Sequence, residues 1–340
     1  MSSNAVSDGI SFDANERYVL TSDVTYRFVA PGLVRATLGD RTVNLPAELH
    51  RLLLEFESPR RPSDVFADID APLEYSDFCH FIRRASANGL ITLERSTPKS
   101  SFELLDVLGE GALASESTKS AVSDALRSDR AVLIPNAMPA DFAASVHSDL
   151  DASSVWRTAE GGDGMFYYRH HNISNYSDFA PKVAEAYGLF ESERTKNGLS
   201  DLSQRDCRGP LQFRATTYFP GDHSLPHADT GYGRSVAFIW YLSREWDPCW
   251  GGNLFWCPSG TVIVPQFNYL LLFNVSRENV HLVTAVSPKA KGRRLTLNGW
   301  WTSANAVEPG HESTTLTTAV LPPRYGREHS IVQGTRILLI

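Results

Sequence analysis

Residues 218–229 read YFPGDHSLPHAD, and this stretch ends in the tripeptide His227-Ala228-Asp229. Side chains two positions apart on a β-strand point to the same face, so His227 and Asp229 can reach into one cavity. A second histidine, His281, follows the apolar run YLLLF at residues 269–273, which reads as a buried strand. Two histidines and one carboxylate can bind Fe(II) on one side and leave the other positions on the metal open. The sequence therefore predicts a metal site at His227, Asp229 and His281.

The His-x-Asp pattern alone is a weak signal, because the chain has ten histidines and 39 acidic residues. A second copy is present at His147-Ser148-Asp149. Apolar and alanine spacing over residues 139–147 predicts a helix there, and residues i and i+2 of a helix do not face each other. We therefore expect this copy to decorate the surface and to bind no metal.

The neighbours of His227 distinguish it from that copy, because they form an ordered series of motifs. The series runs through Tyr218–Gly221, Pro226–Asp229, Tyr241-Leu242, Trp246, Gly251-Gly252, His281 and Arg294–Trp300. It resembles the 2-oxoglutarate/Fe(II) oxygenases of the prolyl 4-hydroxylase type over about residues 205–303, and more faintly from about residue 130. The resemblance implies an α+β fold in which flanking helices cover a double-stranded β-helix (jelly-roll) core.

The same resemblance implies Fe(II), 2-oxoglutarate and O2 as cofactors. It makes His227, Asp229 and His281 both the metal ligands and the catalytic residues. In that chemistry 2-oxoglutarate is converted to succinate and CO2 while an unactivated C–H bond of the substrate is hydroxylated. After His281 the family often has an acidic residue and a short turn, whereas here Leu282–Thr284 and a long turn at residues 289–292 follow. The metal site is unaffected by this departure, but the resemblance alone is no safe guide to the substrate.

The distal carboxylate of 2-oxoglutarate requires a fixed cation, and the planar fork of arginine matches a carboxylate. Arg293 and Arg294 are adjacent candidates. The resemblance places the arginine six positions before the first tryptophan of the closing strand, which selects Arg294. Alternation agrees, because it puts Arg294, Thr296 and Asn298 on one face and turns Arg293 outward. The residues expected at the 2-oxoglutarate site are Arg294, Tyr241, Tyr218 and Asn298.

Composition and pattern divide the chain into five segments. We expect a disordered tail at 1–16, a small winged-helix-like domain at 17–97, a helical linker at 98–128, the dioxygenase domain at 129–305 and a C-terminal extension at 306–340. Within the dioxygenase domain, the stretch 161–200 reads as irregular. His170 and His171 lie in it; neighbours on a strand point to opposite faces, so they make a poor joint metal site, and one of them could line the substrate entrance.

The segment 17–97 predicts a short β-hairpin followed by three helices. Strand patterns at 25–29, 33–38 and 42–45 precede helical spacing at 46–57, 62–69 and 75–88, and Leu90–Leu93 would close a small wing. This outline is similar to the peptide-recognition domains of enzymes that modify ribosomal precursor peptides, including the small chaperone of pyrroloquinoline quinone maturation. The resemblance implies that a leader peptide adds as a strand to an exposed sheet edge. The alternatives are a unit used only for packing, or for contacts in a homodimer.

Charge and composition exclude several classes of partner. The formal net charge of −7 and the absence of a Lys/Arg-rich run argue against a nucleic-acid partner, and no stretch is apolar enough to predict a membrane span or signal peptide. The four cysteines lack zinc-ligand spacing, so free thiols in a reducing cytoplasm are the expectation.

Three functions are compatible with these observations. The first is a dioxygenase that hydroxylates a residue of a peptide, which the N-terminal domain recruits. The second is the same enzyme acting on a free amino acid or another small metabolite, with a structural N-terminal domain. The third, a non-catalytic binding protein, would leave His227, Asp229, His281 and Arg294 without a shared purpose.

Overall fold

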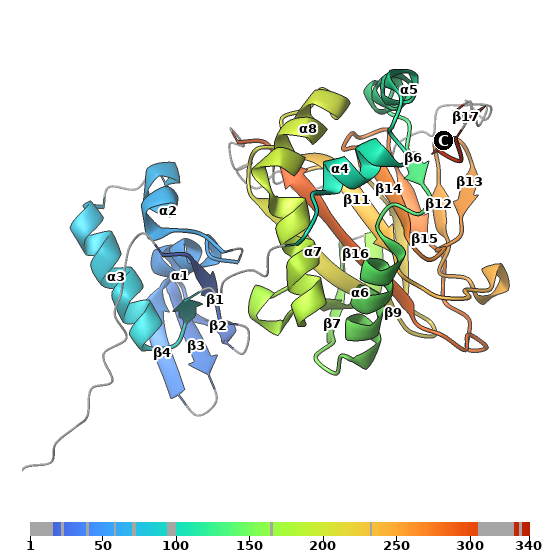
Figure 1. Ribbon diagram of the computed structural model, residues 1–340. Helices are drawn as coiled ribbons and strands as arrows, with labels where there is room; N and C mark the ends of the chain where they lie inside the picture. The colour runs from blue at the N-terminus through green and yellow to red at the C-terminus, as the bar shows by residue number, and fades with distance from the viewer. Residues whose placement is uncertain are drawn as a thin grey trace, which may run out of the picture. The chain divides into compact units, whose positions relative to one another are not determined.

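The computed structural model describes residues 16–21, 24–38, 41–57, 59–69, 73–93, 100–163, 166–231, 233–304, 330–332 and 335–340. The predicted tail at 1–16, apart from its last residue, and most of the predicted extension at 306–340 lie outside these ranges. Contacts along the chain separate two compact units (Figure 1), residues 1–97 with 175–178 and residues 98–174 with 179–340.

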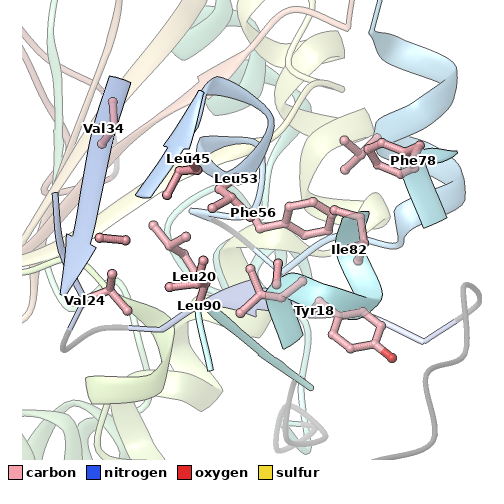
Figure 2. Close-up of a cluster of buried hydrophobic side chains, with 14 residues drawn as sticks. Tyr18, Leu20, Val24, Val34, Leu45, Leu53, Phe56, Phe78, Ile82 and Leu90 are labelled. Atoms are coloured by element: carbon pink, nitrogen blue, oxygen red, sulfur yellow. The ribbon is translucent and has the colours of Figure 1, made fainter. Parts of the chain in front are cut away.

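The N-terminal unit is built from the strands and helices that the sequence pattern predicts. Strands β2, β3 and β4 form an antiparallel sheet in that order, and three helices follow. Their buried faces meet in one core (Figure 2), to which Val34, Phe56, Phe78 and Ile82 contribute fully buried side chains. The bounds are β1 (Tyr18–Leu20), β2 (Thr25–Ala30), β3 (Leu33–Leu38), β4 (Arg41–Pro46), α1 (Ala47–Leu54), α2 (Pro62–Asp68), α3 (Tyr75–Ala87) and β5 (Ile91–Leu93).

Two features of this unit differ from a simple hairpin with a wing. Strand β5 pairs with β1 in a separate antiparallel two-stranded sheet, in which Tyr18 lies opposite Leu93. Strand β2 pairs only with β3 among the described strands, and its residues apart from the half-buried Tyr26 are exposed. The outer side of β2 is therefore an exposed sheet edge.

The second unit is organised by one long antiparallel sheet. Its strands run in the order β13-β12-β15-β10-β8-β9-β16-β11-β14-β6-β18-β17, and β7 pairs with β8. The bounds are β6 (Val132–Ile134), β7 (Arg157–Asp163), β8 (Phe166–Ile173), β9 (Leu211–Tyr218), β10 (His223–His227), β11 (Arg234–Tyr241), β12 (Leu254–Trp256), β13 (Thr261–Ile263), β14 (Tyr269–Asn274), β15 (His281–Val283), β16 (Arg294–Thr302), β17 (Ser330–Ile331) and β18 (Leu338–Leu339).

This sheet rolls up so that strands far apart in its order share an interior. Trp256 of β12 and Phe273 of β14 are both buried, and their rings lie 5.0 Å apart. Tyr241 and Trp300, from β11 and β16, belong to the same apolar cluster as Trp256. A large antiparallel sheet closed on a core in this way is consistent with the predicted jelly roll.

Helices cover the outer face of strands β9, β16 and β11 (Figure 1). Phe190 of α7 packs against Phe213, Phe238 and Trp301, whose ring centroids lie 4.4 to 6.1 Å from its own. The Trp301 indole also donates a hydrogen bond to the Phe190 carbonyl at 2.8 Å. The helices are α4 (Leu104–Glu110), α5 (Glu116–Arg127), α6 (Ala140–Ala152), α7 (Pro181–Glu191) and α8 (Glu193–Ser203).

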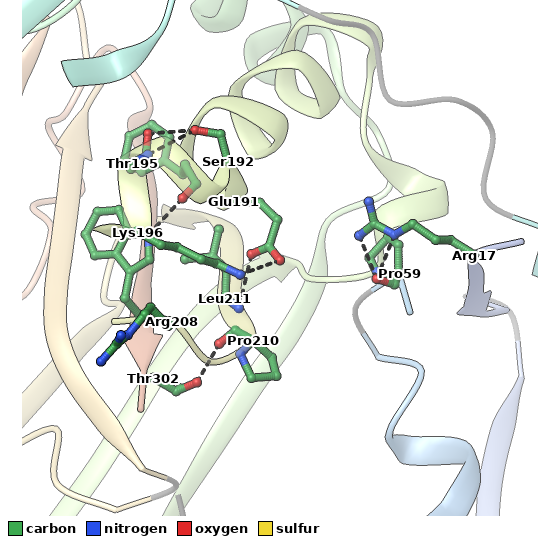
Figure 3. A network of polar contacts seen from close by, with 12 residues as sticks. Arg17, Pro59, Glu191, Ser192, Thr195, Lys196, Arg208, Pro210, Leu211 and Thr302 are labelled. Carbon is green, nitrogen blue, oxygen red and sulfur yellow. Dashed lines mark hydrogen bonds and ion pairs between the residues drawn. The ribbon is translucent and has the colours of Figure 1, made fainter. Parts of the chain in front are cut away.

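A buried polar network fixes the junction of α7 and α8 to the start of β9 (Figure 3). Ser192 caps α8 by accepting the Thr195 backbone N–H. Glu191 pairs with the Lys196 ammonium at 2.7 Å and accepts the Leu211 backbone N–H at 3.2 Å. The outer aromatic layer is therefore held to the sheet by charge pairing as well as by packing.

The expectation that residues 161–200 are irregular is wrong. This stretch holds most of the β7–β8 hairpin and the helices α7 and α8. Gly161 and Gly162 pair with Tyr168 and Tyr167 across the hairpin. The segment 98–128 forms α4 and α5 and belongs to the second unit. The four cysteines are free, as expected. Among the described residues, none of the helices combines the length and the apolar character that a membrane span requires.

Candidate active site

Three side chains, His227, Asp229 and His281, converge on one point. His227 ends β10 and His281 begins β15, and these two residues pair directly across the strands. Asp229 lies just beyond β10, with its Oδ1 3.7 Å from His227 Nε2 and its Oδ2 3.6 Å from His281 Nε2. One ligand atom from each residue lies within 4.8 Å of the others. A single metal ion fits between such a set of atoms.

The hydrogen bonds of the two histidines orient their metal-binding nitrogens. His227 Nδ1 donates to the Leu225 carbonyl at 2.8 Å, and His281 Nδ1 donates to the Asn279 carbonyl at 3.0 Å. A carbonyl can only accept, so the proton resides on Nδ1 and the Nε2 lone pair is left for a metal. The Trp256 ring stacks on His281 at 5.8 Å and supports that ring orientation.

The charge states of these residues suit a divalent metal. Burial, and then the neighbouring His281, lower the pKa of His227 to about 4, so its imidazole is neutral at pH 7. Burial alone would raise the pKa of Asp229, but His281, His227 and Arg234 outweigh it and leave the pKa below its usual value. Two imidazole nitrogens and one carboxylate are a ligand set that fits Fe(II) with open positions.

Arg294 is a buried cation without an acidic partner. The residue is 2% exposed, and none of the described Asp or Glu side chains forms an ion pair with it. Its Nε donates to the Gly252 carbonyl, and its guanidinium carbon lies 4.5 Å from the centre of the Tyr218 ring and 5.8 Å from that of Tyr241. A buried, unpaired guanidinium is costly, so this arrangement suits an anionic ligand.

The other residues expected at the 2-oxoglutarate site differ in whether their polar groups already have hydrogen-bond partners. The Tyr241 hydroxyl is buried and has no hydrogen-bond partner among the described residues. Burial raises the pKa of Tyr241 and of Tyr218, so both phenols stay protonated and can donate. Asn298 is already engaged, because its Oδ1 accepts the Thr216 hydroxyl at 2.6 Å.

Arg293, the other arginine candidate, points away from this pocket. Its Nη1 donates to the Asp151 carbonyl at 2.8 Å at the surface. The backbone therefore turns two adjacent arginines to opposite sides of β16.

One of the two adjacent histidines considered for the substrate entrance, His170, lies near the site, as do two arginines that the sequence analysis does not single out. His170, on β8, lies with its ring 5.4 Å from that of Tyr218, and its Nδ1 is buried without a partner among the described residues. His171 instead pairs with the buried Asp222 at 3.0 Å. Arg214 and Arg234 lie over the Trp300 ring. For Arg214 a signal was available, since it lies four residues before Tyr218 and so shares its face.

The second His-x-Asp copy has a structural role. The prediction that this copy lies at the surface is only partly right. On α6, His147 Nδ1 donates to the Leu242 carbonyl at 2.8 Å, and the side chain is half-buried. Asp149 accepts the Lys182 backbone N–H at 2.8 Å near the start of α7. The two side chains therefore bind different backbone groups, as expected for residues i and i+2 of a helix.

The strands that carry this site match a known protein family. Residues 213–302 match the 2OG-Fe(II) oxygenase superfamily profile. The chain is 28% identical over 160 residues to the prolyl 3-hydroxylase OGFOD1 of Xenopus laevis, covering 39% of this chain and 31% of that protein. It is 31% identical over 130 residues to the Mus musculus protein of the same name, covering 36% and 23%. The chain thus spans less than a third of the length of these relatives.

Solved structures similar to this chain include two prolyl hydroxylases. A Pseudomonas putida prolyl-4-hydroxylase is 22% identical, with a TM-score of 0.40, and covers 54% of this chain and 98% of its own. A Trichoplax adhaerens prolyl hydroxylase, solved with a hypoxia inducible factor peptide fragment, is 18% identical, with a TM-score of 0.46, covering 60% and 94%. The residues 213–302 that match the 2OG-Fe(II) oxygenase superfamily, a group of oxidoreductases that use Fe(II), 2-oxoglutarate and O2, hold all three metal-ligand candidates and Arg294.

Proposed function

We propose that this chain is a 2-oxoglutarate- and Fe(II)-dependent dioxygenase that hydroxylates a C–H bond of a residue in a peptide. The observation that carries the proposal is the pairing of two sites on one inner face. One is the His227-Asp229-His281 cluster, and the other is the buried Arg294, which has no acidic partner among the described residues. The overall reaction takes substrate, 2-oxoglutarate and O2 to hydroxylated substrate, succinate and CO2, with one oxygen atom entering each organic product.

In this proposal each residue has a defined task. His227, Asp229 and His281 hold Fe(II), which supplies the redox chemistry that couples 2-oxoglutarate decarboxylation to C–H oxidation. The carbonyls of Leu225 and Asn279 keep the two imidazoles in the metal-binding tautomer. Arg294 binds the distal carboxylate of 2-oxoglutarate, and the Tyr241 and Tyr218 phenols are the donors beside it. Trp256, stacked on His281, limits the access of water to that ligand.

A peptide is the substrate class that the sequence relatives favour. The two relatives named above are prolyl 3-hydroxylases, so a prolyl residue is the first to test. The alternative substrate remains a free amino acid or another small metabolite, which needs no recruiting domain.

The exposed edge of the N-terminal unit supports recruitment of that peptide. On β2, Phe28 is 67% exposed and Val29 is 38% exposed, although both are apolar. The Tyr26 hydroxyl on the same strand and His50 Nε2 on α1 are buried without partners among the described residues. A peptide added as a strand along β2 would cover the apolar side chains and find hydrogen-bond partners there. A ribosomal precursor peptide is one such ligand.

The metal site is tested by Asp229→Ala. We expect this variant to lose Fe(II) binding and 2-oxoglutarate-dependent succinate formation, while the exposed variant Asp201→Ala keeps both. Succinate release at the wild-type rate from Asp229→Ala would refute the assignment. Incorporation of label from ¹⁸O2 into a peptide product, against free proline as the competing substrate, separates the peptide from the small-molecule alternative.

Recruitment is tested by Phe28→Glu in the full chain. We expect peptide-stimulated succinate formation to fall relative to the peptide-free rate of the same preparation. Exposed Val262 of β13 (55% exposed) provides the matched control, Val262→Glu, because it is apolar and lies in the other unit. Equal stimulation of both variants would remove β2 from the proposal.

A further inference from the structure

The carboxylate of Asp222 is buried in the turn that follows β9, and it accepts hydrogen bonds from both the turn and β8. The residue is 3% exposed. Its Oδ2 accepts the Phe219 backbone N–H at 2.9 Å and His171 Nδ1, on β8, at 3.0 Å. Arg169 Nε, also on β8, lies 3.5 Å from its Oδ1. A buried carboxylate is costly unless its oxygens are paired, so these donors keep the turn in one conformation.

The backbone of the same turn is joined to the segment that follows β15. The Gly221 N–H donates to the Val286 carbonyl at 2.8 Å, and the Val286 N–H donates to the Asp222 carbonyl at 3.1 Å. The Val286 side chain is buried in one apolar cluster with Tyr218, the last residue of β9. The turn therefore links β8, through the Asp222 side chain, to the segment after β15.

These links continue to two groups that contact Arg294. One is the ring of Tyr218, whose centre lies 4.5 Å from the guanidinium carbon. The other is the Gly252 carbonyl, which accepts a hydrogen bond from Arg294 Nε. The Gly252 N–H donates to the Thr284 carbonyl at 3.1 Å, and a Cβ added at Gly252 would lie 3.1 Å from Val286 Cγ2. A displaced turn would therefore move both contacts that set the direction of the guanidinium.

We infer that Asp222, held by His171, is a positioning residue for the Arg294 guanidinium and so sets the affinity of this pocket for a carboxylate. The inference rests on the proposed function, in which Arg294 binds the distal carboxylate of 2-oxoglutarate, and deepens it by naming the residues that aim this arginine. The oxygens of Asp222 already have the partners named above, so the residue acts through the turn and not by pairing with Arg294.

Ligand binding without turnover tests this inference. The two ligands are 2-oxoglutarate and 2-oxobutyrate, which share the 2-oxo acid end and differ because a hydrogen replaces the distal carboxylate in 2-oxobutyrate. The full chain is loaded with Mn(II) in place of Fe(II), in the absence of O2, and the binding of each ligand is measured by calorimetry. A loss of folded protein or of metal affects both ligands alike, so the ratio of the two dissociation constants reports the contact with the distal carboxylate.

We expect the wild type to bind 2-oxoglutarate at least about tenfold tighter than 2-oxobutyrate, because only 2-oxoglutarate can accept a charge-assisted hydrogen-bond pair from Arg294. Asp222→Asn places an amide N–H where an acceptor is needed, so most of this ratio should be lost while the affinity for 2-oxobutyrate is kept. His171→Phe keeps a ring against Phe219 but removes the donor, and should lose a smaller part of the ratio. Glu191→Gln, which changes a half-buried acidic residue at the α7–α8 junction, should keep the wild-type ratio.

Two results would overturn the inference: a wild-type ratio in both Asp222→Asn and His171→Phe, or a weakening of the two ligands by the same factor, which a merely structural role would give. His171→Phe leaves the buried carboxylate in place, so it decides the question by itself should Asp222→Asn not fold. The proposed function fails separately. Equal binding of the two ligands by the wild type shows that Arg294 does not hold the distal carboxylate and rejects both proposals, whereas a wild-type preference that survives in both variants rejects only the role of Asp222.

Discussion

Arg294 and Tyr218 occupy directly opposed positions of β16 and β9, and the guanidinium carbon lies 4.5 Å from the centre of the phenol ring. This register decides which of two adjacent arginines enters the interior. Arg293 faces the other way and donates to the Asp151 carbonyl. A shift of β16 by one residue would exchange the two, since successive side chains of a strand alternate between faces.

Replacing Arg294 by Lys should therefore weaken 2-oxoglutarate binding far more than replacing Arg293 by Lys. A point charge substitutes for a bidentate fork only poorly, and a charge-assisted hydrogen bond is worth about 1.5–3 kcal/mol, or roughly 10- to 100-fold in affinity. Titration of 2-oxoglutarate against succinate formation in both variants measures the difference. The opposite ranking would show that the pocket cation is Arg293.

Gly252 should be essential to the position of Arg294. Its φ is +62°, and a Cβ added there would lie 2.8 Å from Arg294 Cδ. We expect Gly252→Ala to raise the 2-oxoglutarate KM by displacing the arginine. Gly260→Ala is the matched control, because Gly260 has a φ of +71° but no atom within 4 Å of an added Cβ. Both variants carry the backbone strain, so a similar KM change in the two would assign the effect to strain alone.

The buried His170 should make the metal-free protein sensitive to acid. Burial, and then Arg214 and Arg294, lower the pKa of His170 from 6.5 to about 3. The unfolded chain binds this proton and the folded chain does not, so stability is complete above pH 6.5 and declines as the pH falls toward 3. Uptake of one proton on unfolding lowers the free energy of unfolding by about 1.4 kcal/mol for each unit that the pH falls. Chemical denaturation between pH 7 and 4 should show a shallower decline in His170→Phe, and an unchanged slope would contradict the burial of a neutral imidazole.

The buried pair of Lys196 and Glu191 should contribute more to stability than a surface pair of the same kind. The two side chains are 5% and 20% exposed, whereas those of Lys119 and Glu116 are 44% and 88% exposed. Lys196→Met removes the ammonium that pairs with the half-buried Glu191 carboxylate and should cost about 2 kcal/mol, whereas Lys119→Met should cost less than about 1 kcal/mol. Unfolding by urea, followed by tryptophan fluorescence, measures both. Equal losses would mean that the network at the α7–α8 junction is solvated.

The sequence predicts the parts of the site that lie in short, regular motifs. His227 and Asp229 are two residues apart, and strand alternation places them on one face. Helical and strand periods likewise predict the elements of the N-terminal unit. These inferences need only local geometry, which residue spacing encodes directly. The choice of Arg294 over Arg293 comes from the family resemblance, and strand alternation agrees with it.

The rest depends on which strands become neighbours. His170 reaches the site because β8 lies between β10 and β9, and Arg234 reaches Trp300 because β11 pairs with β16 across a register shift near Arg234. Neither the contact of His170 with Tyr218 nor that of Arg234 with Trp300 joins residues that are close in the sequence. The β7–β8 hairpin also depends on strand pairing. Its glycines and adjacent polar residues are typical of a loop, so the sequence pattern does not predict strands there.

The strand β6 has consequences for how this molecule is made. It lies between β14 and β18, and the adjacent Arg130 donates to the carbonyl of Leu339, 209 positions away. Ala131 and Ile340 exchange backbone hydrogen bonds of 3.1 and 2.8 Å, and both are buried. During translation one side of β6 must therefore wait, with its backbone groups unpaired, until residues 338–340 leave the ribosome. Contacts between such distant segments slow folding, so the second unit is a natural client for a chaperone while it is being synthesised.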